Sequence, residues 1–165
     1  MKARSTDKTA LIKHIISRLT STHQQAVSAA QQAYNTATDD ENIAENKYDT
    51  LGLEASYLAQ GQSKRVKEIE ADLETYSRLQ ARSFASDEPI SVGALINLID
   101  DENNEKTLFI GPTAGGLTLN LAGQEITLIT PSAPLAQLLM GKHTGDEVEL
   151  SIGSTHHCYE ITMLA

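Results

Sequence analysis

The residues with most chemical potential in this 165-residue chain are five carboxylates gathered between positions 39 and 49. They are Asp39, Asp40, Glu41, Glu45 and Asp49, and one lysine, Lys47, lies among them. Carboxylate oxygens are the protein ligands that Mg²⁺ prefers, and a dense negative charge also suits a basic groove on a partner protein. A third interpretation is that the cluster merely keeps an exposed loop solvated, which is the usual role of a charge run.

Two segments with helical periodicity flank this cluster. Seam positions recur every three or four residues over residues 12–37, and again in the second segment at Leu51, Ala55, Leu58, Gln62, Val66, Ile69, Leu73 and Tyr76. One antiparallel register centred on Ala44 satisfies both stripes, because it sets Ala33 against Ala55 and Leu19 against Ile69. The pattern therefore predicts an antiparallel coiled-coil hairpin over residues 1–82, with the carboxylates at its tip.

The size of the seam residues changes along the predicted hairpin. Near the tip the first helix contributes mostly alanine, whereas near the base it contributes isoleucine and leucine, which bury more apolar area. Gly52 and Gly61 each cost the second helix about 1 kcal/mol relative to alanine. We therefore expect the tip end of the hairpin to be the looser end.

A different pattern begins after residue 82. Residues 83–90 lose the helical period and include Pro89, which cannot continue a helix interior. From residue 91 onward the chain reads as short strands separated by turns, with one short helix that starts near Pro134 and ends at Gly141. We therefore predict an α+β protein in which a linker over 83–90 leads to a domain over 91–165 with a strongly bent antiparallel sheet.

Composition narrows the function classes. The net charge is −9, and residues 83–165 hold 2 Lys/Arg against 11 Asp/Glu, so we expect little direct affinity for duplex DNA. The apolar runs are far shorter than the ~20 residues that span a bilayer, and residues 1–18 are too polar for a secretory signal. Cys158, the one cysteine, cannot form an internal disulfide. These features favour a cytoplasmic protein without membrane contact.

Other candidate sites are weak. His156, His157 and Cys158 are adjacent, and in a strand their side chains alternate between faces, so they do not predict a zinc site. The segment at 111–116, GPTAGG, lacks the lysine of a phosphate-binding loop and predicts a turn. Lys64, Arg65 and Lys67 are a solvated helix face in the simplest interpretation, and a contact to a partner protein or to a nucleic-acid phosphate in the sharper one.

Three stretches of sequence suggest a family. The chain contains ENIAENKYDT at the predicted tip, KRVKEIEADL in the second helix, and ITPSAPLAQLLMGKHTGDEVEL in the second domain. Together they resemble the Gre-type transcript cleavage factors of bacterial RNA polymerase, and the resemblance covers nearly all of the chain. It implies that the second domain has an FKBP-like fold.

The resemblance also implies a partner and a mechanism. Such factors bind RNA polymerase and insert the hairpin into its secondary channel, where acidic tip residues help to hold a second Mg²⁺ for cleavage of backtracked RNA. The factor assists the polymerase active site, so it is not an enzyme itself and needs no cofactor of its own. The tip residues that would act there are Glu41, Glu45 and Asn46, of which Glu45 and Asn46 match the family pattern. Asp40, Glu41 and Glu45 would be the ligands of the shared ion.

Four residues of the second domain are candidates for docking to polymerase. They are Pro134, Leu135, Gly141 and Lys142, in the stretch that carries the stronger part of the resemblance. The other interpretation of these residues is a purely architectural turn. The hairpin leaves little unused seam for a dimer, so we expect a monomer.

The tip departs from the family pattern. Where that pattern has an aspartate before the glutamate and asparagine, this chain has Asn42, and Tyr48 lies one position closer than usual. The missing aspartate leaves two functions open, stimulation of cleavage or a non-catalytic regulator or inhibitor that binds the channel. A remote third is an FKBP-like prolyl isomerase or chaperone, which the scarcity of aromatic residues disfavours.

Overall fold

The computed structural model describes residues 7–46 and 48–165, and the chain divides into two compact units. One unit comprises residues 16–77, and the other combines the chain up to residue 15 with residues 78–165. Lys8 shows why the start of the first helix belongs with the sheet. Its ammonium donates to the carbonyl oxygen of Gly93 at 3.1 Å and lies 4.6 Å from the centre of the Phe84 ring.

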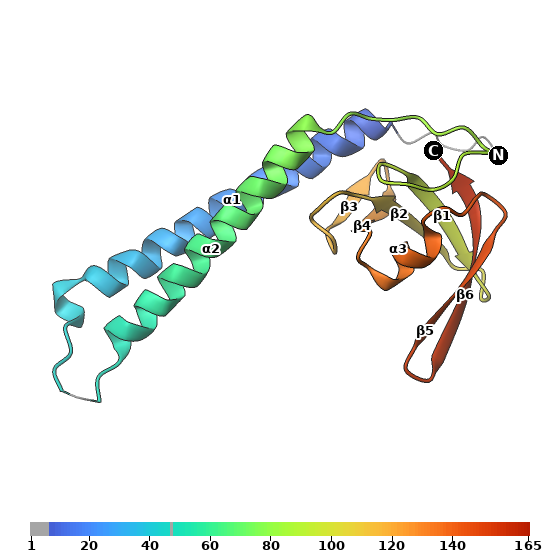
Figure 1. The fold of residues 1–165 in the computed structure, drawn as a ribbon. Coiled ribbons are helices and arrows are strands. Elements are labelled where there is room, and N and C mark those ends of the chain that lie inside the picture. The colour runs from blue at the N-terminus through green and yellow to red at the C-terminus, as the bar shows by residue number, and fades with distance from the viewer. Residues whose placement is uncertain (1–6, 47) are drawn as a thin grey trace. The chain divides into compact units, whose positions relative to one another are not determined.

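The first elements form the predicted hairpin (Figure 1). Helix α1 spans Lys8–Thr38, a short 3-10 helix η1 spans Asp40–Asn42, and helix α2 spans Leu51–Arg78. The turn between α1 and α2 contains Ala44, so the predicted pivot of the chain is confirmed. None of the helices in the described part of the chain is long and apolar enough to cross a membrane.

The seam of the hairpin is unevenly buried. Its buried residues include Ile15, Leu19, Ala26 and Ala33 of α1, and Ala55, Ile69 and Tyr76 of α2. Ala33 and Ala55 also line one groove, as the predicted register requires.

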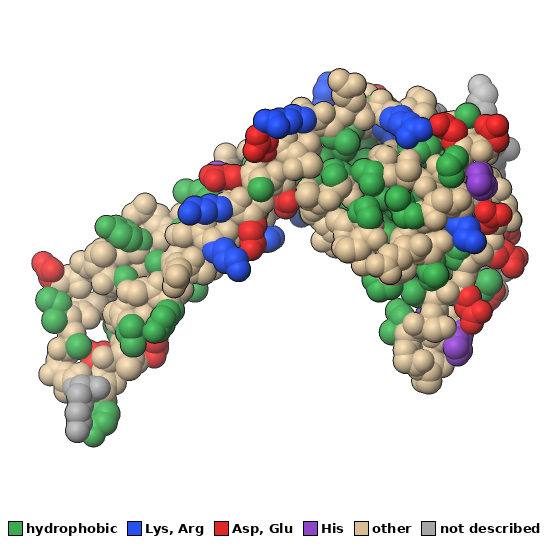
Figure 2. All heavy atoms as spheres, in the orientation of Figure 1, with side chains coloured by type: hydrophobic (Ala, Val, Ile, Leu, Met, Phe, Trp, Pro, Cys, Tyr) green, Lys and Arg blue, Asp and Glu red, His purple; other side chains and the backbone are tan. Residues whose placement is uncertain are grey.

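Leu51 and Leu58 depart from that prediction, because their exposed fractions are 49% and 57%. From α1, the groove beside them is lined by Ala29, Gln32, Ala33 and Thr36, and this lining leaves both leucines in contact with solvent. Figure 2 shows hydrophobic side chains on the surface of the hairpin near the turn.

The second unit contains a six-stranded sheet with the order β3-β4-β2-β1-β6-β5. The strands are β1 Leu95–Asp100, β2 Glu105–Ile110, β3 Thr118–Leu121, β4 Gln124–Ile129, β5 Glu147–Ile152 and β6 Thr155–Leu164. The predicted strands are confirmed, but the sheet is mixed rather than wholly antiparallel, because β2 pairs with β4 in parallel. The chain runs through β3 between these strands, so it re-enters beside β2 in the same direction.

Helix α3, Pro134–Leu139, is the predicted short helix of this unit. Its buried residues, Ala136 and Leu139, belong to a core that also includes residues of four strands: Ile96, Leu98, Leu108, Ile110, Val148, Tyr159 and Ile161. This core gives the sheet unit a hydrophobic interior of its own, independent of the hairpin seam.

Candidate functional site at the hairpin tip

The tip begins at the C-terminal end of α1. A helix C-terminus leaves carbonyl oxygens unsatisfied. Here the side-chain amide of Asn42 donates to the carbonyl oxygen of Thr36 at 3.1 Å, and the Thr38 hydroxyl donates to that of Tyr34 at 2.9 Å. Asn42 therefore holds the turn against the end of α1.

Two of the five tip carboxylates perform structural tasks. The Asp39 carboxylate accepts the backbone N–H of Glu41 at 2.9 Å and so caps η1. The Asp49 carboxylate accepts the N–H groups of Glu45 and Leu51, each at 3.3 Å. Through these contacts Asp39 fixes the backbone just after α1, and Asp49 fixes the backbone just before α2.

Polar side chains also fix the descending side of the turn. The side-chain oxygen of Asn46 accepts the N–H of Tyr48 at 2.8 Å, and the Thr50 hydroxyl donates to the Glu54 carboxylate at 2.6 Å. Asp49 and Glu54 lie beside the N-terminus of α2, where the helix dipole favours negative charge. Asn46, which the family resemblance marks as functional, thus has a structural contact within the turn.

The remaining three carboxylates face solvent. Asp40, Glu41 and Glu45 are exposed, and within the described residues no side-chain hydrogen bond or ion pair involves their carboxylates. Asp40 and Glu41 also follow the negative end of α1, whose last turn contains no basic residue. This charge is therefore not compensated locally within the described chain, and a cation from outside would find it accessible.

The three predicted metal ligands do not form a chelating set by themselves. Among residues 7–46 and 48–165 no group of three Asp, Glu, His or Cys side chains converges closely enough to hold an ion. The oxygens have the right chemistry for Mg²⁺. Any such ion would need most of its ligands from elsewhere. Lys47, the lysine of the cluster, lies outside the described residues.

The turn and its approaches also expose apolar side chains, a feature that the sequence analysis did not single out. Ile43 is 66% exposed and Tyr48 is 79% exposed, and further exposed residues lie on the helices at Val27, Tyr34, Leu51, Leu53, Tyr57 and Leu58. Contact with a partner would remove this apolar surface from water, which is favourable. The signal in the sequence was the presence of Ile43 and Tyr48 in a charged loop.

The basic residues of α2 lie on the hairpin, away from the turn. Lys64, Arg65 and Lys67 are exposed, and the Arg65 guanidinium forms an ion pair with Glu68 at 3.5 Å. A surface pair of this kind contributes little to stability. The three cations therefore remain accessible to a partner.

The four predicted docking residues lie at the two ends of α3. Pro134 is exposed at the first turn, and Leu135 packs partly against the core. At the other end Gly141 adopts a φ of +79°, which side chains disfavour, and its N–H donates to the carbonyl oxygen of Ile90 at 2.9 Å. The carbonyl oxygen of Lys142 accepts the N–H of Ile90 at 2.8 Å. The Gly141 and Lys142 backbone thus holds the chain just before β1.

The two remaining sequence candidates have ordinary roles. His156 lies on β6, where its Nδ1 is 3.1 Å from the Glu149 carboxylate and 2.9 Å from the Ser151 hydroxyl. Burial and the nearby carboxylates of Asp101 and Glu147 raise the pKa of the Cys158 thiol. Residues 111–116 form the predicted loop, with positive φ angles at Ala114 and Gly116.

Similarity to characterised proteins agrees with this architecture. No protein-family profile matches the chain. Transcription elongation factor GreA of Rickettsia canadensis is 29% identical over 127 residues, 73% of this chain and 75% of that protein. GreA of Rhodospirillum rubrum is 25% identical over 136 residues, 82% of this chain and 81% of its own. GreA of a Sulfurovum species reaches 33% over 79 residues, 48% of this chain and 46% of its own.

Solved structures give a weaker likeness. The structure of the transcription factor Gfh1 has a TM-score of 0.41 at 18% identity, and covers 92% of this chain and 94% of its own. The GreA factor homolog Gfh1 of Thermus thermophilus has a TM-score of 0.37 at 16% identity, and the shares are 91% and 94%. Along most of its length, this chain is therefore similar in sequence to the Gre-type transcription elongation factors.

Proposed function

We propose that this protein is a transcription elongation factor that binds RNA polymerase and inserts its hairpin tip into the secondary channel. The observation that supports the proposal best is the set of three exposed carboxylates, Asp40, Glu41 and Glu45, on a turn carried by two antiparallel helices. From residue 16 to residue 38, α1 extends about 33 Å at ~1.5 Å per residue. A rod of this length and the width of two helices can carry charge into a narrow channel.

At the polymerase active site the tip would act through its carboxylates. Glu41 and Glu45 would each offer an oxygen ligand to an Mg²⁺ shared with the polymerase, and Asp40 would add negative charge beside them. When bound, that ion supplies an activated water and neutralises charge during phosphodiester cleavage. In this proposal the factor assists the polymerase and has no active site of its own.

The turn's own hydrogen bonds would keep those carboxylates available. Asp39 and Asp49 hold the backbone, so they are not free to serve an ion without loosening the turn. This division singles out Glu41 and Glu45 as the residues for the first tests. It also makes Asp39 and Asp49 poor choices, because their substitution would change the shape of the tip.

The test is RNA cleavage in stalled, backtracked elongation complexes with Mg²⁺. The protein should shorten the RNA, and Glu45→Ala or Glu41→Ala should slow this by about 10-fold or more while binding to polymerase persists. Glu125→Ala, which removes an exposed carboxylate on β4, is the matched control and should leave the rate unchanged. Failure to bind polymerase would refute the proposal.

A non-catalytic channel regulator is the second candidate, and Asn42 favours it. Its amide donates to Thr36 and serves as a structural contact, at the position where the family pattern has an acid. If this candidate is right, the protein will bind polymerase and inhibit elongation or cleavage without shortening RNA. Binding without cleavage by the intact protein therefore separates the two functions.

The sheet unit would supply the docking contacts outside the channel. Pro134 and Lys142 are exposed at the two ends of α3, whereas Leu135 is partly buried. Lys142→Glu should weaken polymerase binding because it reverses a charge on an exposed side chain. Glu125→Lys on β4 provides a charge-reversal control on another part of the sheet unit. If Lys142→Glu and the unmodified protein bind polymerase with equal affinity, the ends of α3 have an architectural role and no role in docking.

A further inference from the structure

Strand β5 is an open edge of the sheet (Figure 1). In the described part of the chain it pairs with β6 alone. An edge strand presents a row of backbone N–H and C=O groups with which a further strand can pair. The strand is about 20 Å long at ~3.3 Å per residue, and it contains no Pro or Lys that would block such pairing. This edge can therefore accept another extended chain.

The hydrogen bonds at the start of β5 show which of its backbone groups face outward. The N–H of Ile161 donates to the carbonyl oxygen of Asp146 at 2.9 Å, so these two residues form a hydrogen-bonded pair of the antiparallel ladder. Such pairs alternate with pairs whose backbone groups point away from each other. The register of β5 with β6 is regular from residue 147 to residue 152. The N–H and C=O groups of Glu147, Glu149 and Ser151 therefore point away from β6.

The side chains along this edge differ between its two faces. The register sets Glu147 directly opposite Glu160, and Glu149 lies two residues along the strand on the same face. The other face belongs to the core, where Val148 is buried. The three carboxylates are exposed, and among the described residues no Lys or Arg forms an ion pair with them. The basic group beside them is the His156 imidazole, 3.1 Å from Glu149. The outer face of the edge is therefore acidic.

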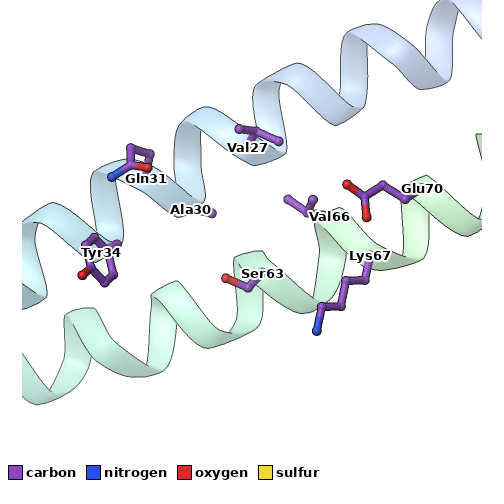
Figure 3. Close-up of a pocket in the computed structure, with 8 residues that line it drawn as sticks. All are labelled: Val27, Ala30, Gln31, Tyr34, Ser63, Val66, Lys67 and Glu70. Atoms are coloured by element: carbon purple, nitrogen blue, oxygen red, sulfur yellow. The ribbon is translucent and has the colours of Figure 1, made fainter.

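Two other surfaces lack such a consistent charge. The groove between α1 and α2 has a volume of about 490 Å³, and its apolar residues Val27 and Tyr34 lie beside Lys67 and Glu70 (Figure 3). Because these two charges have opposite signs, they do not favour one class of occupant. The opposite edge of the sheet, β3, is four residues long and carries no charge. The β5 edge is therefore the more selective surface.

The charge on β5 argues against a second copy of the same strand as its occupant. Two β5 strands that overlap along most of their length would bring Glu147 and Glu149 of one copy close to those of the other, and opposed like charges are destabilising. A strand with Lys or Arg at alternate positions would instead set a cation opposite each carboxylate. Its intervening side chains would lie on the other face beside Leu150, which is partly buried in the core, so apolar residues suit those positions.

We propose that the β5 edge binds an extended, basic segment of a partner protein by antiparallel strand addition. In this mode the main-chain hydrogen bonds supply affinity, and alternate side chains supply specificity. Directly opposed residues of an antiparallel ladder share a face, so the partner's basic residues lie opposite Glu147 and Glu149 in hydrogen-bonded pairs. The interaction is separate from the proposed action at the polymerase active site, which uses the hairpin tip.

Hydrogen exchange of the full chain, followed by NMR, tests whether the edge is open and becomes occupied. The probe is the peptide acetyl-Lys-Val-Lys-Val-Lys-Val-Lys-amide at low salt. In the free protein the amides of Glu147, Glu149 and Ser151 should exchange quickly, and those of Val148 and Leu150 slowly. Excess peptide should slow the first set by about tenfold or more and leave the second set unchanged. Unchanged exchange of the first set would overturn the proposal.

Two N-methylated forms of the peptide test the geometry. Methyl groups on the lysine nitrogens remove the N–H groups that face β5, so this form should bind about tenfold more weakly or worse. Methyl groups on the valine nitrogens point away from β5 and should be tolerated. Equal binding of the two forms would mean that charge alone attracts the peptide, and would overturn strand addition. The reverse order of affinity would overturn the antiparallel direction.

Variants of the protein test the same edge. The double variant Glu147→Lys with Glu149→Lys should weaken peptide binding by about tenfold or more, whereas Glu125→Lys, exposed on β4, should not. Ser151→Pro removes an outward N–H but no bond to β6, so it should weaken binding with both charges intact. Ser151→Ala is its control. Undiminished binding by the double variant would overturn the proposal.

A further outcome identifies a different occupant. If the Glu149 amide becomes protected without peptide as the protein concentration rises, a second copy occupies the edge and the proposal is wrong. These measurements contain no polymerase, so they succeed or fail independently of the proposed function.

Discussion

At the scale of single residues, the tip divides its polar side chains between two tasks. Asp39, Asp49 and Asn42 accept or donate hydrogen bonds that shape the turn, whereas Asp40, Glu41 and Glu45 extend into solvent. The carboxylates of the tip are therefore alike in composition but differ in role. The distinction decides which substitutions test function and which only disturb the turn.

Asn42→Asp should destabilise the protein by about 1 kcal/mol. The substitution removes the donor to the Thr36 carbonyl oxygen and places a negative charge beside the negative end of α1. Urea unfolding followed by helical circular dichroism measures the effect. Asn42→Ala is the control, because it removes the hydrogen bond without adding charge and should be milder. An Asn42→Asp variant as stable as the unmodified protein would contradict the structural role of the amide.

Lys8 predicts a stability that depends on pH. Burial, with a contribution from the Arg82 guanidinium, lowers the pKa of Lys8 to about 8. The unfolded chain keeps the ordinary lysine pKa of about 10.4, so between these values it binds more protons than the folded chain. The free energy of unfolding should therefore rise with pH in this window, as the cost of burying the charge disappears.

Unfolding in urea between about pH 7.5 and 9.5 tests this effect of Lys8. Lys8→Met keeps most of the aliphatic side chain without the titrating group, so the rise should be smaller in this variant. Lys64→Met, which alters an exposed lysine of α2, should behave like the unmodified protein. A Lys8→Met protein with the same pH profile as the original would show that Lys8 does not produce the rise.

At the scale of elements, the hairpin has a packed base and a loosely packed end near the turn. Ile15 and Ile69 are almost fully buried, while Leu51 and Leu58 near the turn are about half exposed. Alanines on α1 allow the helices to approach but cover little of the opposing surface. The hairpin therefore gains most of its stability far from the charged turn, and the turn end remains open to other contacts.

Two truncations on α2 measure this asymmetry. Ile69→Ala should lower the free energy of unfolding by about 3 kcal/mol, because it removes buried methyl groups and leaves a cavity. Leu58→Ala should cost less than about 1 kcal/mol, since that side chain already contacts solvent. Both are read from urea unfolding. Similar costs at the two positions would mean that the seam is equally packed along its length.

At the scale of the whole molecule, acidic and basic residues are unevenly distributed along the chain. The protein carries a net charge of −9, and residues 83–165 hold 2 Lys/Arg against 11 Asp/Glu. Exposed cations on α2 and exposed acids at the turn share the hairpin, with residues 19–38 of α1, which include no Lys, Arg, Asp or Glu, between the turn and Arg18. A protein partner with basic surface is therefore a better match than a nucleic acid.

Duplex DNA should bind weakly. Stable binding needs a basic surface that releases counterions from the phosphates, and a molecule with this net charge is repelled instead. Fluorescence anisotropy of a labelled duplex should show no binding near 0.15 M salt and only a weak signal when the salt is lowered. Tight binding with a steep dependence on salt would contradict this expectation and would point to Lys64, Arg65 and Lys67.

Local patterns in the sequence identified most of the elements. Apolar residues at steps of three and four predicted both helices and the turn around Ala44. Short apolar runs between turn residues predicted the strands, and Pro134 and Gly141 predicted α3. Local propensity suffices here because each element carries its own apolar stripe. The pairing of β2 with β4 was not predictable in this way, since strand direction depends on how the chain returns after β3.

The sequence also predicted the candidate site only in part. The sequence alone determined that the carboxylates lie at the turn of a hairpin, because helical periodicity on both sides leaves no other place for them. The backbone conformation of the turn decided which of them are available, because Asp39 and Asp49 accept backbone N–H groups within it. The packing of the two helices decided that Leu51 and Leu58 stay exposed. Hydrogen bonds and burial depend on distances between residues that periodicity does not encode, so only the folded chain could assign these roles.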